Sequence, residues 1–251
     1  MATRMFPIFI AIIISESLAS SFVSPPEPNK LVVPHQENHL PEVKITSPGD
    51  NSTFTNNEQV TYTITVSDAE DGDSKYDEIN PREVLLKVQY LKDETKLKTE
   101  LNRKTPNETA ALASILTSNC FNCHKSATKS IGPSLYAIRK KYSATTANIT
   151  LLSKRIRYGS AGIWGKPTMP THPELTRKET QNIVRWMLQN GANPNINYYT
   201  GLDGSFRMNP FPASKKKGAY ILTAIYIDHG IKEAPFKQRL KGEDAVVIHS
   251  R

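Results

Sequence analysis

The chain has 251 residues, 38% of them apolar, and a formal net charge of +8. This length and apolar fraction suit one large domain or two small ones with a packed core, and they exclude a bundle of membrane helices. The charge is uneven, because residues 107–193 hold twelve Lys or Arg against three acids while the remainder is close to neutral. We therefore expect a two-part chain. We expect no nucleic-acid partner, because no nucleic-acid-binding motif accompanies the basic segment.

The first residues have the pattern of a secretory signal peptide. Arg4 precedes the apolar run 5–14, and small residues follow around Ala19. We interpret residues 1–19 as a signal peptide cleaved after Ala19, with a retained N-terminal anchor as the alternative. The apolar run is too short to span a bilayer comfortably, so we expect no membrane span after cleavage. The chain is then exported to the periplasm or the cell surface.

Strands are expected next. Residues 20–40 are rich in Pro, Ser and Asn and are interpreted as a linker. Over 60–66, apolar residues alternate with threonine, which is typical of a half-buried strand, and 42–46 and 84–91 have similar composition. We assign 41–106 to the first part of a β-sandwich.

The loop between these strands is rich in carboxylates. Its acids could bind a calcium ion, although their spacing is not that of an EF-hand and acidic turns are common in such loops. The acids concerned are Asp68, Glu70, Asp71, Asp73, Asp77 and Glu78.

Residues 107–193 have a helical pattern. Helices are expected over 108–119 after the cap Asn107, over 134–142, over 149–158, and from the cap Thr176 to Gly191. The pattern returns to strand at 220–227, which is apolar on both faces, and at 245–249. We interpret 194–217, with Tyr198, Tyr199 and Phe206, as a linker, and 218–251 as the last strands of the sandwich.

The two groups of strands suggest one interrupted domain. Two strands alone are marginally stable in water, whereas both groups together make a set of sandwich size. The expected fold is multi-domain α + β, with a small all-α domain inserted into a β-sandwich.

The motif that carries chemistry is Cys120-Phe-Asn-Cys123-His124, the Cys-x-x-Cys-His arrangement of c-type haem attachment. Two thiols three residues apart on one helical turn can each bond a haem vinyl group, and the next residue is then directed at the iron. We predict one covalent haem c. A structural zinc site would need more ligands than two cysteines, and a thioredoxin-like pair would need a βαβ context.

Met169 is the expected second iron ligand. It lies in 165–170, which we predict to be a proline-bounded loop without regular structure that can cover the distal side of a haem. Met187 fits the apolar face of a helix better, and Met208 lies beyond the helices. The alternative is that Met169 only fills a gap in the core. A His/Met pair suits electron transfer.

Residues 107–192 resemble a small bacterial class I cytochrome c. The resemblance rests on the haem motif, on 131–136 (IGPSLY), on 155–165 (RIRYGSAGIWG) and on 168–170 (TMP). It implies that the Pro133 carbonyl binds the ligand histidine, and that Arg155 and Trp164 bind the haem propionates. The family often has Asn shortly after the methionine, whereas this chain has Thr171-His172, so the Met–iron bond is expected to be tuned differently.

The flanking segments resemble a second family. Residues 41–48, 66–72 and 84–90 before the helices, and 218–228 and 240–248 after them, are similar to the C-terminal module of bacterial quinone-dependent glucose/sorbosone dehydrogenase-like proteins. There an immunoglobulin-like domain is interrupted by a cytochrome c. The catalytic propeller of that family would lie upstream, where this chain has only the expected signal peptide and linker, so we expect no inherited catalysis.

The expected function is electron transfer to or from a redox partner, such as a quinone-dependent dehydrogenase or a terminal oxidase. The docking face is expected at the haem edge beside the cysteines, among Lys125, Lys129 and Lys166. The basic excess there has two interpretations: it steers an acidic partner, or the haem propionates partly neutralise it and the rest is solvated surface. The alternatives are a haem peroxidase or dehydrogenase subunit, and a carbohydrate- or protein-binding module in which exposed aromatic residues of 194–217 form the surface.

Overall fold

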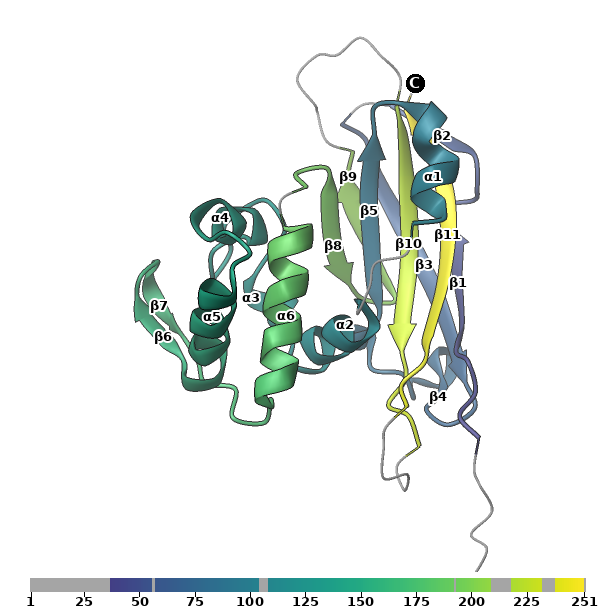
Figure 1. Cartoon of the computed structure of the whole chain (residues 1–251). Coiled ribbons are helices and arrows are strands. Elements are labelled where there is room, and N and C mark those ends of the chain that lie inside the picture. The colour runs from purple at the N-terminus through teal and green to yellow at the C-terminus, as the bar shows by residue number, and fades with distance from the viewer. Residues whose placement is uncertain are drawn as a thin grey trace, which may run out of the picture. The chain divides into compact units, whose positions relative to one another are not determined.

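The computed structural model describes residues 37–55, 57–103, 108–191, 193–208, 218–231 and 238–250. The expected signal peptide, most of the expected linker 20–40, and the expected cap Asn107 lie outside the described residues. The elements run from strands through helices and back to strands, as Figure 1 shows. The expected order of elements along the chain is therefore confirmed.

Two sheets form a sandwich. The first has β3 (Gln59–Asp68) paired on one edge with β1 (Glu42–Ser47) and on the other with β4 (Gly72–Asp73) and β9 (Asp203–Arg207). The second has the order β2-β11-β10-β5-β8, with these bounds: Ser52–Phe54, Lys241–Ser250, Ala219–Ile227, Leu85–Leu91 and Ile196–Thr200. Strands from both sides of the helical segment pair within each sheet, so one sandwich is split by the insertion.

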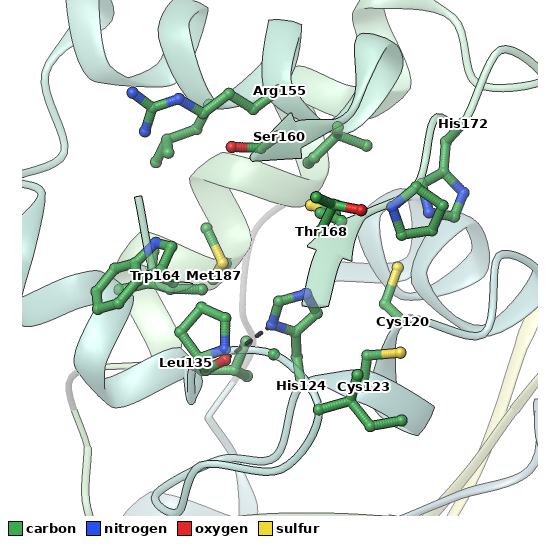
Figure 2. A pocket seen from close by; sticks show the side chains of 18 of the residues that line it. Cys120, Cys123, His124, Leu135, Arg155, Ser160, Trp164, Thr168, His172 and Met187 are labelled. Atoms are coloured by element: carbon green, nitrogen blue, oxygen red, sulfur yellow. Dashed lines mark hydrogen bonds between the residues drawn. The ribbon is translucent and has the colours of Figure 1, made fainter. Parts of the chain in front are cut away.

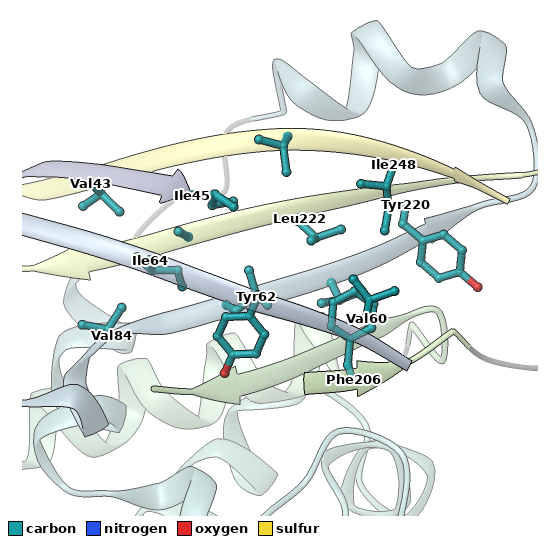
Figure 3. Close-up of a cluster of buried hydrophobic side chains, with 14 of the residues drawn as sticks. Val43, Ile45, Val60, Tyr62, Ile64, Val84, Phe206, Tyr220, Leu222 and Ile248 are labelled. Carbon is teal, nitrogen blue, oxygen red and sulfur yellow. The ribbon is translucent and has the colours of Figure 1, made fainter. Parts of the chain in front are cut away.

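The alternating pattern of β3 produces the sandwich core. Val60, Tyr62 and Ile64 are buried while the threonines between them are exposed. These buried side chains meet Leu222 and Ile248 of the second sheet (Figure 3). Side chains on a strand alternate between its two faces, so β3 contributes one face to the core and the other to solvent.

Strand β10 is buried on both faces. Tyr220 and Leu222 pack in the sandwich core, whereas Ile225 and Ile227 pack with the helices. The expectation that 220–227 is apolar on both faces is confirmed, and its reason is the helical segment on the outer face of this sheet. Glu108 at the start of the helical segment also lies 3.5 Å from Lys241 Nζ at the start of β11.

The helical segment has the bounds α2 Glu108–Thr117, α3 Cys120–Cys123, α4 Leu135–Lys141, α5 Thr146–Tyr158 and α6 Arg177–Asn190, with the hairpin β6 Ser160–Gly162 and β7 Gly165–Met169. Shorter helices near the sheets are η1 Ser74–Tyr76, η2 Pro81–Glu83, η3 Glu94–Lys96 and α1 Leu97–Leu101. The four expected helices are confirmed. The third begins earlier than expected because the Thr145 hydroxyl caps it by accepting from Asn148 N–H. The Thr176 cap forms a capping box with Glu179.

We expected the segment 194–217 to be a linker, but it contains strands. Its described part contains β8 and β9, one in each sheet. Phe206 is buried in the sandwich core with Tyr199 against it, and Tyr198 packs among the helices instead. These three aromatic residues therefore fill cores, which contradicts the alternative in which they form an exposed binding surface.

The acidic loop does not gather its carboxylates. Glu70 binds His39, Asp71 binds Tyr226 and His229, and Asp73 caps η1. Among the described residues, no group of three or more His, Cys, Asp or Glu is arranged to hold a metal ion. Separately, the described helices are all too short or too polar to cross a membrane.

Candidate functional site

A cavity of about 350 Å³ lies inside the helical segment. This volume is within the range of about 300–1,000 Å³ typical of small-molecule and cofactor sites. It is lined by α3, the loop that follows it, α5, α6 and the β6–β7 hairpin, and most of the lining is apolar. All seven predicted site residues line this cavity: Cys120, Cys123, His124, Pro133, Arg155, Trp164 and Met169. Figure 2 shows the labelled ones around it.

The two cysteines lie on one turn of helix. Cys120 and Cys123 are the first and last residues of α3, and His124 N–H donates to the Cys120 carbonyl to end that turn. Both cysteines are free thiols rather than a disulfide. Burial raises the pKa of Cys120 to about 12, so this thiol is protonated at neutral pH. Both thiols border the same cavity, as covalent attachment of one cofactor would require.

The His124 ring is held by the loop after α3. Its Nδ1 lies 2.8 Å from the Pro133 carbonyl oxygen. A carbonyl only accepts, so Nδ1–H is the donor and Nε2 keeps its lone pair. Burial lowers the pKa of His124, and the Pro133 hydrogen bond only partly opposes this effect. The ring is therefore a neutral imidazole with one nitrogen available for a metal ion, the form in which histidine binds metals.

Gly132 is a site residue that the sequence reasoning missed. A Cβ built on Gly132 would lie 2.6 Å from His124 Cε1 and 2.9 Å from Nδ1. The backbone of residue 132 therefore packs against the imidazole ring, and a side chain would displace it. The signal available in the sequence was a glycine directly before Pro133, where the chain approaches the ring.

Met169 lines the same cavity as the cysteine turn and lies at the end of a hairpin. We expected a loop without regular structure here, but 165–169 is strand β7, and Ser160 pairs with Met169. Paired backbone holds the methionine more firmly than a free loop would. Met187 of α6 lines the same cavity, whereas Met208 is fully buried in the sandwich core. The structure thus leaves two methionines that can reach a bound group.

Arg155 and Trp164 border the cavity with polar atoms. Arg155 Nη1 donates to the Tyr142 hydroxyl at 2.7 Å, and Lys141 Nζ lies 4.7 Å from the centre of the Trp164 ring. Two positive groups therefore stand near this side of an otherwise apolar cavity. Trp186 also lines it, and its buried Nε1–H has no hydrogen-bond partner within the described part of the chain.

One side of the site is covered by the sandwich. Phe121, between the two cysteines, stacks on Tyr198 of β8 with ring centres 5.4 Å apart, and Trp186 lies 5.3 Å from the same tyrosine. Tyr198 N–H donates to Ser126 Oγ at 3.0 Å. The surface beside the cysteines, expected to be a docking face, is therefore partly occupied by β8. Three lysines expected around that face are exposed: Lys125, Lys129 and Lys166.

These residues fit a haem. Two thiols on one turn, a neutral imidazole with a free nitrogen and a thioether in the lining of the same apolar cavity are the donors that a covalent c-type haem needs. A buried indole N–H without a partner also borders the space. The same residues do not fit a structural zinc site, which needs four ligands.

Comparisons with known proteins cover the helical segment. Residues 110–191 match the family model described as Cytochrome c. A cytochrome c2 of Rubrivivax gelatinosus is 36% identical over 87 residues, which are 34% of this chain and 96% of that protein. A cytochrome c-552 of Nitrosomonas europaea is 34% identical over 70 residues, 28% of this chain and 68% of that protein. The crystal structure of wild-type Nitrosomonas europaea cytochrome c552 aligns with a TM-score of 0.29 and 31% identity, covering 31% of this chain and 95% of that one.

Proposed function

This chain belongs to the cytochrome c family, whose members carry electrons on a covalently bound haem, and we propose that it does so with a single haem ligated by His124 and Met169. Cys120 and Cys123 form the two thioether bonds. The bound haem supplies a one-electron iron couple. The proposal is supported above all by one observation, that both thiols, the imidazole and the Met169 thioether border one apolar cavity.

The residues around the iron ligands have supporting roles. The Pro133 carbonyl fixes the orientation of the His124 ring and increases its basicity, as partners of metal-bound histidines do. Arg155 and Trp164 bind the haem propionates at the polar side of the cavity. The apolar lining excludes water from the iron, which favours electron transfer over ligand exchange.

Visible absorption spectra test the ligand assignment. The full-length protein is matured in a host that attaches haem, and its oxidised and reduced spectra are compared for wild type, Met169→Leu and Met187→Leu. The weak long-wavelength band of a Met–iron bond should disappear only in Met169→Leu. If Met187→Leu removes the band instead, Met187 is the ligand. A high-spin, ligand-accessible iron in the wild type would contradict the His/Met assignment altogether.

The location and partner complete the proposal. The protein is exported to the periplasm or the cell surface and exchanges electrons with a separate redox protein, such as a quinone-dependent dehydrogenase or a terminal oxidase. The split sandwich serves as an immunoglobulin-like docking module. Exposed lysines near the cavity, Lys129 and Lys166 among them, favour an acidic partner. Electron exchange with such a partner should slow as ionic strength rises, and a rate that does not depend on salt would contradict this docking mode.

A further inference from the structure

The start of β1, the end of β3 and the end of β10 lie at the end of the sandwich where β4 lies (Figure 1). Asn38 precedes β1, Asp68 is the last residue of β3, and Asp228 directly follows β10. Asp68 is 7% exposed and Asp228 is fully buried. Asn38 Nδ2 donates to Asp228 Oδ2 at 2.7 Å, and Asp71, three residues after Asp68, accepts from the backbone N–H of His229, the residue after Asp228.

Two buried side-chain oxygens here, one of Asp68 and one of Asn38, accept no hydrogen bond from the described residues. Asp68 Oδ1 accepts from the backbone N–H groups of Glu70 and Asp71, but its buried Oδ2 has no partner among the residues described. Asn38 Nδ2 donates to Asp228 and to the Gln238 carbonyl, and the buried Oδ1 of the same amide is likewise unpartnered. Turning the amide over would place its oxygen against two acceptors, so this orientation is the satisfactory one. Unpaired buried acceptors are rare in native proteins.

The neighbouring acids Asp71 and Glu83 both pair with a histidine. His229 lies 3.0 Å from Asp71 and 2.7 Å from Glu83, whereas no ion pair of Asp68 or Asp228 occurs in the described part of the chain. Asp228 is held by backbone N–H groups of Gly230 and Leu240. Burying a negative charge without a counter-charge is costly, so a bound cation would offset that cost.

We propose that Asp68, Asn38 and Asp228 bind one calcium ion through Asp68 Oδ2, Asn38 Oδ1 and the Asp228 carboxylate. Calcium accepts six to eight oxygen ligands in flexible geometry, including amide and backbone carbonyl oxygens and water, whereas magnesium needs a near-ideal octahedron. The site would use two carboxylates and an amide, and so it differs from the carboxylate-rich loop first considered. Because Asn38 precedes the first strand, the ion would tie the segment leading into the sandwich to two strand ends.

Calcium binding to the full-length, haem-loaded protein tests the site. After dialysis against EDTA, isothermal titration with CaCl₂ should show one ion per chain, and CaCl₂ should raise the unfolding temperature more than equal MgCl₂ does. Asp68→Asn should weaken binding by roughly tenfold or more, since affinity follows the charge of the ligand set. Asp77→Asn, an exposed acid of the same loop, is the matched control and should bind like wild type.

The wild-type titration decides the proposal even if Asp68→Asn fails to fold. No calcium binding to wild type, with stability equal in EDTA and CaCl₂, would overturn it. Equal binding by wild type and a folded Asp68→Asn variant would also overturn it. Neither result depends on the haem ligands, because the site lies in the sandwich.

Discussion

Replacing Tyr198 with alanine should destabilise the whole described unit, because this side chain joins the sandwich to the haem turn. Tyr198 belongs to β8, yet its ring packs against Phe121 between the two cysteines and against Trp186 of α6. Its hydroxyl makes no hydrogen bond within the described residues. The ring, rather than the hydroxyl, therefore carries the stabilisation.

Two estimates bound the loss in the free energy of unfolding. Each aromatic pair contributes about 0.5–1.5 kcal/mol beyond burial, so the two pairs together contribute about 1–3 kcal/mol. Truncating a buried aromatic side chain to alanine costs about 3–5 kcal/mol including the cavity. Tyr198 is half-buried rather than fully buried, so the expected loss lies at the lower end of this range, about 3 kcal/mol. Tyr198→Phe keeps both ring contacts and should change the free energy of unfolding by less than about 0.5 kcal/mol.

Urea unfolding of the haem-loaded protein measures this loss in the free energy of unfolding. Far-UV circular dichroism follows the backbone and visible absorbance follows the iron ligands, and both midpoints should fall together in Tyr198→Ala. The described residues belong to one compact unit, so we expect the sheets and the helices to respond jointly. A loss below about 1 kcal/mol, or an equal loss in Tyr198→Phe, would refute the assignment of the stabilisation to ring packing.

Two further predictions concern the imidazole and the response to acid. Gly132→Ala should displace the His124 ring, because the new Cβ would lie 2.6 Å from His124 Cε1. It should therefore reduce the yield of protein with a normal low-spin haem spectrum. Gly49→Ala is the control and should not reduce this yield, because the nearest atom to its Cβ is 3.7 Å away. The pKa of Glu100 is lowered mainly by the hydrogen bond from the Gln89 amide. Ionised Glu100 therefore stabilises the fold at pH values above its ordinary pKa of 4.5. This contribution is lost as the pH falls through the lower pKa of the folded protein. Glu100→Gln should lose less urea resistance than wild type on acidification, and an identical pH profile would contradict this.

The haem site could be predicted from the sequence because covalent chemistry requires its residues at fixed spacing. Cys120, Cys123 and His124 are close along the chain, so one helical turn brings them together wherever that turn lies. Met169 is distant from them, and its prediction relied on the proline-bounded segment 165–170 and on the poorer fit of the other methionines. The structure places it at the same cavity, in a strand instead of a loop, because the pairing of Ser160 with Met169 is a contact between residues nine apart.

Periodicity likewise predicted the main helices and several of the strands, but not what they pack against. The alternation in β3 predicted a half-buried strand, and the two apolar faces of β10 predicted burial on both sides. Only the tertiary structure decided that β8 and β9 join the two sheets, that Tyr198 covers the cysteine turn, and that Asn38 meets Asp68 and Asp228. These are contacts between distant segments, and their energy comes from burial and from hydrogen bonds that local sequence does not encode.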